Sequence, residues 1–264
     1  MTTVPDLLRM KSEQRRFAVL TAHDAATAAI VDRAQIPVIL VGDSLANAAL
    51  GYQTTLPITL DEMLHHCRAV ARGASNALLV GDLPFMSYEV SPEQALVSAG
   101  RMLKEGGMHA VKLEGGSDQA ETVRRLSGAG IPVMGHLGLT PQKVHMFGGY
   151  KVQGRDERSQ TEIARAARDL EQAGAFSLVL EAVPAGLAER ITAASGIPTI
   201  GIGAGPHCDA QVLVLNDMLG MSMRVPRFVK RYGELGTEIE RMARSFASEV
   251  EGGAFPAPEH VYKA

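Results

Sequence analysis

The sequence lacks several features that would place it in a familiar class of proteins. Its only two cysteines, Cys67 and Cys208, lie far apart and outside any metal-ligand spacing, so we expect reduced thiols rather than a disulfide or a zinc site. No apolar run approaches the roughly 20 residues that cross a bilayer. Charged residues interrupt the first residues, where a signal peptide would have its apolar core. These absences favour a cytoplasmic protein without a membrane partner.

The chain also lacks an excess of either charge. Its formal net charge is −3, which provides no basic field for nucleic acid. There is no repeat of solenoid period, no low-complexity segment and no linker that would mark a second domain. We therefore expect one domain over residues 1–264, with an N-terminal helix in 1–15 and a C-terminal tail in 252–264.

What the chain does have is a recurring apolar run that ends in a polar residue or a glycine. Residues 38–43 and 77–82 both end in Val-Gly-Asp, and other runs end in His136, in Glu181 and in the glycine-rich segment 201–205. Such runs indicate strands, and the segments between them have helical periodicity. The 264 residues are close to the about 250 of an eight-stranded parallel barrel. We therefore predict the α/β class and a (β/α)8 TIM barrel with an extra N-terminal helix.

The expected elements follow from this pattern and from cap residues. The predicted strands are 17–21, 38–41, 77–82, 110–114, 131–136, 178–181 and 198–200, the last followed by the glycine-rich loop 201–205, with 221–225 as a weak candidate for the eighth. The predicted helices are 4–14, 25–33, 59–72, 91–105, 118–126, 161–173, 185–194, 209–218 and 234–250. Residues 59–62 resemble a capping box that is offset by one residue. The long irregular segment 142–158 favours a lid or a substrate wall.

The strand at 110–114 carries charges where a buried strand normally carries Val or Ile. Lys112 and Glu114 are two residues apart and therefore point to the same face. Removing an ion from water costs several kcal/mol, so these charges either form an internal pair or bind another group. Right-handed crossovers would bring five ionisable groups at strand ends to one rim, namely Asp43, Asp82, Glu114, His136 and Glu181.

The three carboxylates of this rim suit a magnesium ion. Asp43, Asp82 and Glu114 offer the oxygen ligands that Mg²⁺ takes, whereas zinc prefers nitrogen and sulfur donors. Lys112 beside them would hold or balance a negatively charged substrate. Taken singly, each Asp is explained as well by a helix cap after a strand. The five groups together are not explained in that way.

The sequence resembles the ketopantoate hydroxymethyltransferase family in motifs that run in family order over nearly the whole chain. The motifs are Val-Gly-Asp-Ser at 41–44, Asp-Leu-Pro-Phe at 82–85, Val-Lys-Leu-Glu-Gly-Gly at 111–116, Gly-His-Leu-Gly-Leu-Thr-Pro-Gln at 135–142, Gly-Gly-Tyr-Lys-Val-Gln-Gly at 148–154, Gly-Ile-Gly-Ala-Gly at 201–205 and Phe-Pro-Ala-Pro-Glu-His at 255–260. The resemblance implies a barrel of the phosphoenolpyruvate/pyruvate superfamily, a role in pantothenate biosynthesis and a homodecamer.

The resemblance also implies roles for individual residues. Asp43, Asp82 and Glu114 match the magnesium site, and Glu181 matches the proton acceptor. The expected oxo-acid contacts are Asp43, Ser44, Asp82, Lys112 and His136. We expect His136 to be an orienting donor, and it remains a rival base.

The implied reaction transfers a hydroxymethyl group from 5,10-methylenetetrahydrofolate to 3-methyl-2-oxobutanoate, giving 2-dehydropantoate through a Mg-assisted enolate. The residues at four positions depart from the family pattern, namely His23, Lys143, His145 and Ala210. These departures bear on how the folate cosubstrate docks and on the rate of the reaction.

Two other functions remain open from the residues alone. A lyase or mutase of the same superfamily would need the same rim, but those enzymes usually carry a Cys-Gly-His loop that neither Cys67 nor Cys208 provides. A non-catalytic metabolite-binding barrel would be expected to lack a metal-ligating residue or the catalytic base. Neither is missing from this sequence. The segment 201–205 is not a dinucleotide fingerprint.

Overall fold

A computed structural model of the chain describes residues 1–262, and it confirms the predicted parallel barrel. Within these residues eight strands pair in chain order, all parallel, and the last pairs with the first, so the sheet closes. The strands are β1 Phe17–Thr21, β2 Val38–Val41, β3 Leu78–Asp82, β4 Ala110–Glu114, β5 Val133–Gly138, β6 Ser177–Glu181, β7 Thr199–Ile202 and β8 Ala210–Leu213.

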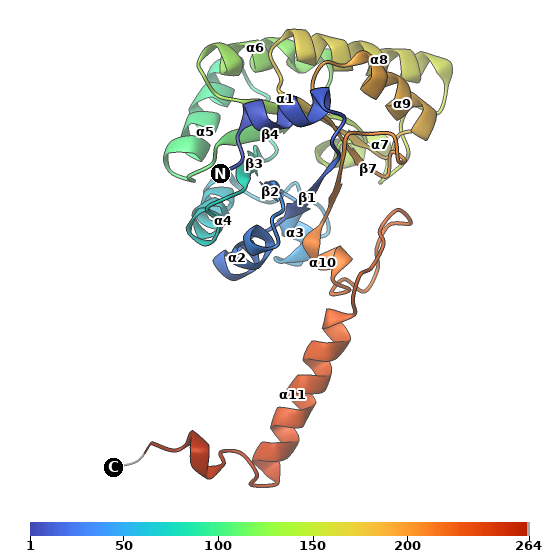
Figure 1. The fold of residues 1–264 in the computed structure, drawn as a ribbon. Coiled ribbons are helices and arrows are strands. Elements are labelled where there is room, and N and C mark those ends of the chain that lie inside the picture. The colour runs from blue at the N-terminus through green and yellow to red at the C-terminus, as the bar shows by residue number, and fades with distance from the viewer. Residues whose placement is uncertain (263–264) are drawn as a thin grey trace. The chain divides into compact units, whose positions relative to one another are not determined.

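Helices between the strands form an outer layer around the sheet (Figure 1). The helices of the described residues are α1 Val4–Ser12, α2 Ala25–Arg33, α3 Leu45–Ala48, α4 Leu60–Gly73, α5 Pro92–Lys104, α6 Ala120–Gly128, α7 Val144–Phe147, α8 Glu157–Gln172, α9 Ala185–Ala194, α10 Leu215–Met218 and α11 Leu235–Glu251, with 3-10 turns η1 Ser117–Gln119, η2 Pro141–Lys143 and η3 Pro258–His260. The molecule consists of two compact units, Met1–Val214 and Leu215–Ala264. The barrel is the first unit, and the single domain expected from the sequence stays a prediction.

The helix starts are set by caps that the sequence shows. Thr59 accepts a hydrogen bond from the Glu62 backbone N–H, and the Glu62 carboxylate accepts from the Thr59 backbone N–H. This is a capping box at the usual spacing, so the predicted offset of one residue was wrong. Ser91 caps α5, whose first residue is a proline, and Asp24 caps α2.

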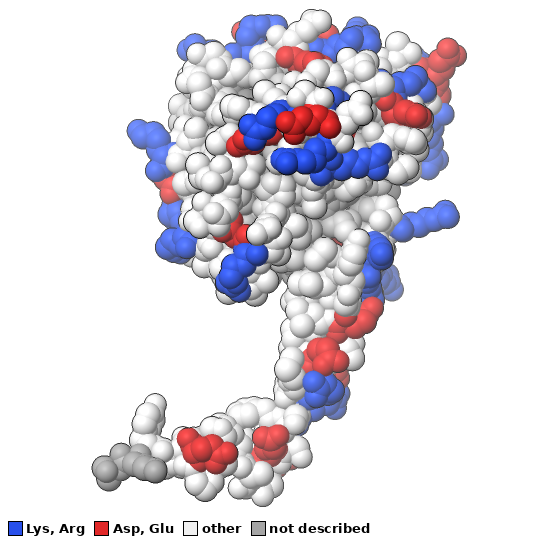
Figure 2. All heavy atoms as spheres, viewed as in Figure 1, with Lys and Arg blue, Asp and Glu red and all other residues white. Residues whose placement is uncertain are grey.

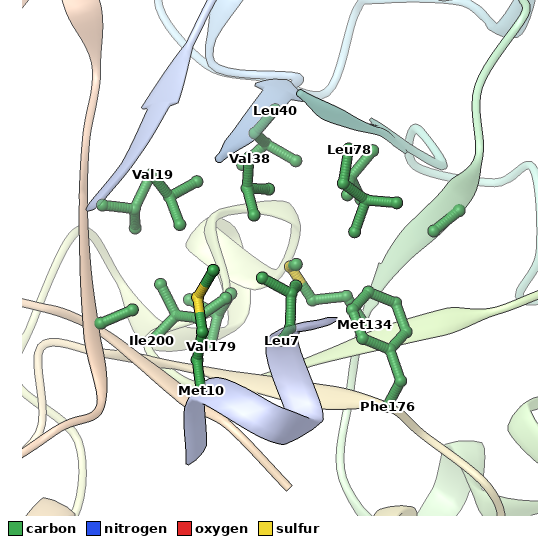
Figure 3. Packing of buried hydrophobic residues seen from close by; sticks show 14 residues of the cluster. Leu7, Met10, Val19, Val38, Leu40, Leu78, Met134, Phe176, Val179 and Ile200 are labelled. Atoms are coloured by element: carbon green, nitrogen blue, oxygen red, sulfur yellow. The ribbon is translucent and has the colours of Figure 1, made fainter. Parts of the chain in front are cut away.

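The N-terminal helix α1 closes the end of the barrel at which the strands begin. Leu7 is fully buried and Met10 nearly so. Figure 3 shows both side chains pointing from α1 toward residues of the strands, among them Val38, Leu78 and Met134. Burying one such side chain contributes about 1.5–3 kcal/mol. Helix α1 thus covers the end of the barrel at which the strands begin. The carboxyl ends of the strands, where the charged residues lie, are at the opposite end.

The eighth strand is where the sequence prediction was wrong. Residues 209–218 were expected to be a helix and 221–225 a strand, but β8 is Ala210–Leu213 and 221–225 is irregular. The Asp209 carboxylate does not cap a helix, because it accepts hydrogen bonds from the Thr199 backbone N–H and from Lys11 Nζ. Along β8 the side chains alternate between buried and exposed positions, which is the pattern of a strand.

The segment 142–158 is less irregular than expected. It includes part of η2 and all of α7, and α8 begins at Glu157 instead of at residue 161. The earlier start has a local cause, because Asp156 accepts a hydrogen bond from the Ser159 backbone N–H and the Ser159 hydroxyl reaches back to Asp156. Asp156 and Ser159 stand at capping-box spacing in the sequence, but the predicted start of the helix did not take them into account.

The second unit contains a terminal helix that carries both charges. Arg241 pairs with Glu238, and Arg244 pairs with Glu240, at helical spacing. On the face of the barrel unit drawn in Figure 2, basic and acidic side chains are likewise interspersed among uncharged ones. No helix within residues 1–262 is both long and apolar enough to cross a membrane.

Candidate active site

The strand register places charged residues side by side at the carboxyl ends of the strands. Asp82 of β3 lies opposite Lys112 of β4, and Glu114 of β4 lies opposite His136 of β5. All four residues are at most 5% exposed. Side chains two apart on β4 therefore contribute a cation and an anion to the same buried cluster, as the sequence indicated.

Lys112 and Asp82 form a buried ion pair. Lys112 Nζ lies 3.1 Å from Asp82 Oδ2 and 3.3 Å from His136 Nδ1. The backbone N–H of Asp43 also donates to Asp82 Oδ2, at 3.0 Å. Burial opposes the charge of Lys112, but the neighbouring carboxylates, Asp82 foremost, raise its pKa above the usual range. Lys112 therefore carries its positive charge inside the barrel mouth.

His136 lies between two carboxylates. Its Nδ1 is 3.4 Å from Glu114 Oε1, and its Nε2 is 3.1 Å from Glu181 Oε2. Burial and the charge of Lys112 lower the pKa of His136, but the contacts with Glu114 and Glu181 outweigh them and raise it to about 9. Glu181 is the most exposed of these groups, with 15% of its side chain accessible. The histidine therefore links the interior carboxylate to the one at the edge.

Burial and mutual repulsion act on the three carboxylates predicted to hold a metal. Burial, followed by the charges of Asp82 and Glu114, raises the pKa of Asp43 to about 7. Burial also raises the pKa of Asp82, although Lys112 opposes the shift. Burial would raise the pKa of Glu114 as well, but hydrogen bonding and charge from His136 leave it lowered. An added cation would relieve this repulsion.

The donor atoms fit a hard cation. Asp82 Oδ1 and Glu114 Oε1 are buried carboxylate oxygens, and carboxylate oxygens are the ligands that Mg²⁺ takes. Asp82 Oδ1 has no hydrogen-bond partner, and Glu114 Oε1 has only the 3.4 Å ion-pair contact with His136 Nδ1. In the described part of the chain, no three His, Cys, Asp or Glu side chains already stand as a metal-holding group. The fit therefore rests on these two oxygens and on the repulsion felt by Asp43.

Gly42 leaves room beside this cluster. A Cβ at residue 42 would lie 3.0 Å from Ser44 Oγ and 3.6 Å from Asp82 Oδ2. The Ser44 hydroxyl and the Asp82 carboxylate therefore border the same small space, which a side chain at residue 42 would fill. The structure thus brings the last predicted substrate contact, Ser44, to the rim.

Two residues of the cluster, Gln142 and Tyr88, are not among those expected from the sequence. Gln142 donates through Nε2 to Asp43 Oδ2 at 2.9 Å and through its backbone N–H to Glu114 Oε2 at 3.0 Å. Tyr88 donates through its hydroxyl to Gln142 Oε1 at 2.6 Å. Gln142 ends the motif at 135–142, which was the one available signal. Nothing in the sequence around Tyr88 singles it out.

Two of the residues that depart from the family pattern, His23 and Lys143, have partners outside these ion pairs. His23 is joined to α4, where His66 Nδ1 lies 2.7 Å from the His23 carbonyl oxygen. Lys143 pairs with Asp118 at 3.5 Å.

Comparisons with known proteins cover nearly the whole chain. Residues 1–258 match the family model described as ketopantoate hydroxymethyltransferase. The chain is 58% identical over 258 residues to the 3-methyl-2-oxobutanoate hydroxymethyltransferase of Saccharopolyspora erythraea, covering 97% of this chain and 88% of that protein. It is 54% identical over 261 residues to the protein of the same name from Heliobacterium modesticaldum, covering 98% and 95%.

Among solved structures the barrel is similar to 2,3-dimethylmalate lyase, a member of the PEP mutase/isocitrate lyase superfamily. The TM-score is 0.61 at 15% sequence identity, and the match covers 99% of this chain and 92% of that one. At this identity the likeness supports the fold alone.

Proposed function

This chain belongs to the ketopantoate hydroxymethyltransferase family, and from that premise we propose how its rim performs the reaction. The reaction is the transfer of a hydroxymethyl group to 3-methyl-2-oxobutanoate, giving 2-dehydropantoate for pantothenate biosynthesis. The observation that carries the proposal is the buried pair of Lys112 and Asp82, set among carboxylates in a family member matched over residues 1–258. The Lys112 ammonium group can bind the carboxylate of such an oxo acid, and the neighbouring carboxylates can hold a metal ion beside its keto group.

Asp43, Asp82 and Glu114 are the residues that would hold Mg²⁺. Two buried carboxylate oxygens support this assignment: Asp82 Oδ1, which has no hydrogen-bond partner, and Glu114 Oε1, which has only a 3.4 Å contact with His136. When bound, the ion would polarise the keto group of the substrate and make its C3–H bond more acidic. The ligand assignment and the identity of the metal belong to this proposal.

Lys112 and Ser44 would bind and orient the oxo acid. The ammonium group supplies a fixed positive charge toward the oxygen on which negative charge develops, and such preorganised charge is often the largest contribution to catalysis. The Ser44 hydroxyl beside Gly42 would donate a hydrogen bond to a substrate oxygen. Asp82 holds Lys112 in place.

Glu181 would remove the C3 proton. It ends β6 at the edge of the rim, and its carboxylate is more accessible than those of Asp43, Asp82 and Glu114. His136 touches Glu181 on one side and Glu114 on the other, so it orients the base. The carbon that loses its proton then forms a bond with the methylene carbon of 5,10-methylenetetrahydrofolate, and both C–N bonds of that methylene carbon break. One water per turnover supplies the hydroxyl group, and its second proton and the proton taken from C3 end on the two nitrogens of the tetrahydrofolate that leaves.

Two assays test the reaction and the base. Product formation from the oxo acid and methylene folate should stop when a chelator removes divalent ions and return with Mg²⁺. Exchange of the C3 proton for deuterium, without folate, should be lost in Glu181→Gln and retained in Glu189→Gln, an exposed position on α9. Exchange at the wild-type rate in Glu181→Gln would remove that residue from the role.

We also propose a cytoplasmic homodecamer. Exposed apolar residues at spacings of three and four support self-association of α11, namely Ile239, Met242, Phe246 and Val250. Both cysteines are free and buried, in keeping with a reducing compartment. Light scattering on the full chain measures the assembly, and a monomer at micromolar concentration would contradict it.

A further inference from the structure

Gln142 joins two of the rim carboxylates through hydrogen bonds that the proposed mechanism does not use. Its Nε2 donates to Asp43 Oδ2 at 2.9 Å and to the Leu83 carbonyl oxygen at 3.0 Å. Its backbone N–H donates to Glu114 Oε2 at 3.0 Å. The residue is only 5% exposed. Gln142 therefore fixes one oxygen of a carboxylate that follows β2 and one oxygen of a carboxylate that ends β4.

Asp43 and the Leu83 carbonyl oxygen determine which way the Gln142 amide points, and Tyr88 gives the amide oxygen its partner. The Tyr88 hydroxyl donates to Gln142 Oε1 at 2.6 Å and accepts from the Glu114 backbone N–H at 3.2 Å. A reversed amide would bring its oxygen against Asp43 Oδ2 and the Leu83 carbonyl oxygen, which are both acceptors. The observed orientation gives every polar atom of this buried side chain a partner, as buried polar groups require.

We propose that Gln142 and Tyr88 are positioning residues that hold Asp43 and Glu114 at a fixed separation for a divalent cation, an inference that rests on the proposed function. The chain of hydrogen bonds starts at the Glu114 backbone, passes through Tyr88 and Gln142, and ends on Asp43. Gln142 also engages Glu114 Oε2, and Glu114 Oε1 has only the 3.4 Å contact with His136 Nδ1. Each carboxylate is thereby oriented through one of its two oxygens.

A neutral amide suits this position better than a second cation would. Lys112 already lies 3.1 Å from Asp82, and another ammonium group beside Asp43 would compete with the metal for the same negative charge. An amide donates hydrogen bonds without cancelling that charge. Groups that orient metal ligands in this way typically change metal affinity or activity by about 10- to 100-fold when they are mutated.

The test measures Mn²⁺ binding to the full-length protein after metal removal, in the absence of substrates. Tyr88→Phe keeps the ring and removes only the hydroxyl, Gln142→Met keeps much of the volume and removes the amide, and the double variant combines them. Tyr232→Phe and Gln160→Met are matched controls at exposed or surface positions. Titration calorimetry gives the Kd for Mn²⁺, thermal unfolding of the metal-free protein gives its Tm, and turnover is measured at saturating Mg²⁺.

We expect each single variant to raise the Kd for Mn²⁺ by about 10- to 100-fold, and the controls to stay within about twofold. Both residues belong to the same series of hydrogen bonds, so their effects should not add. The double variant should bind Mn²⁺ with a Kd no more than about threefold above that of the weaker-binding single variant. A lower Tm with an unchanged Kd in both single variants would show a merely structural role and overturn the proposal. Absence of Mn²⁺ binding to the wild-type protein would overturn it as well.

The same measurements separate this inference from the proposed function. If the wild-type protein binds Mn²⁺ and the variants bind it weakly, the positioning role stands even when no 2-dehydropantoate forms, and it is then the proposed reaction that fails. If the wild-type protein forms product while the variants keep the wild-type Kd, the reaction stands and the positioning role fails. Should Gln142→Met not fold, Tyr88→Phe alone decides the question.

Discussion

Lys112 Nζ lies 3.1 Å from Asp82 Oδ2, and the two residues are register partners on neighbouring strands of the closed sheet. The pair is nearly inaccessible to water, and desolvation of such a pair costs several kcal/mol per ion. An ion pair that served only to stabilise the fold could be replaced by apolar residues with little loss of stability. This pair is accompanied by further carboxylates, and Asp82 Oδ1 has no hydrogen-bond partner, so we infer that the charges serve binding.

Replacing Lys112 by Met should damage both stability and turnover. Asp82 would keep the Asp43 backbone donor but lose its cation, and removing one partner of a buried pair costs about 3–5 kcal/mol. We expect turnover to fall by at least about 100-fold, as for other preorganised electrostatic groups. Urea unfolding and product formation measure the two effects. Lys104→Met, at an exposed position near the end of α5, is the control, and wild-type turnover in Lys112→Met would contradict the assignment.

Gly42→Ala should weaken binding of the oxo acid. The added methyl group would lie 3.0 Å from Ser44 Oγ, so the hydroxyl must move away from its position beside Asp82. We expect the KM for the oxo acid to rise by about tenfold, on the order of 1.4 kcal/mol, with a smaller change in kcat. The control is Gly100→Ala on α5, where a Cβ meets no atom within 4 Å. Equal KM values for the two variants would show that the space beside Gly42 is not used by substrate.

Leu7→Ala should destabilise the barrel without changing its chemistry. Leu7 is fully buried under the end of the barrel opposite the rim, and truncating a buried Leu costs about 2–5 kcal/mol. We expect a lower Tm and an unchanged kcat per folded molecule. Leu8→Ala, at a neighbouring and exposed position, should leave the Tm nearly unchanged. A similar Tm in both variants would mean that α1 contributes little to the closure of the barrel.

His109 should make stability depend on pH on the acid side of neutrality. Burial lowers the pKa of His109 below the ordinary histidine value of 6.5. Its Nδ1 accepts a hydrogen bond from the Leu79 backbone N–H at 3.0 Å, which requires an unprotonated nitrogen. The unfolded chain then binds more protons than the folded one below about pH 6.5. The stabilising contribution is present above that pH and is lost as the pH falls toward the folded pKa.

The measurement for His109 is the free energy of unfolding between pH 5 and pH 8. The slope on the acid side should be smaller in His109→Asn than in the wild-type protein. His207→Asn, on an exposed loop, should keep the wild-type slope. An unchanged slope in His109→Asn would show that burial of this ring does not govern the acid sensitivity.

The alternation of strands and helices was predictable because its signals are local. A short apolar run before Gly-Asp, a cap such as Ser91 followed by a proline, and a charge pair such as Lys112 and Glu114 are all contained within a few residues. The prediction failed at β8, where residues 209–218 were expected to form a helix. The Asp209 carboxylate binds Lys11, a contact across 198 positions of the chain that no local pattern contains.

The sequence by itself determined the barrel, the caps and the identity of the residues at the carboxyl ends of the strands, because periodicity and capping act between near neighbours. The tertiary structure decided which atoms of those residues meet. Gln142 reaches Asp43 across 99 positions of the chain, and that contact exists only because the sheet closes and brings distant strand ends to one rim. Closure also removes water from the rim, so the paired charges and the buried oxygens of Asp82 and Glu114 acquire their strength only in the folded barrel.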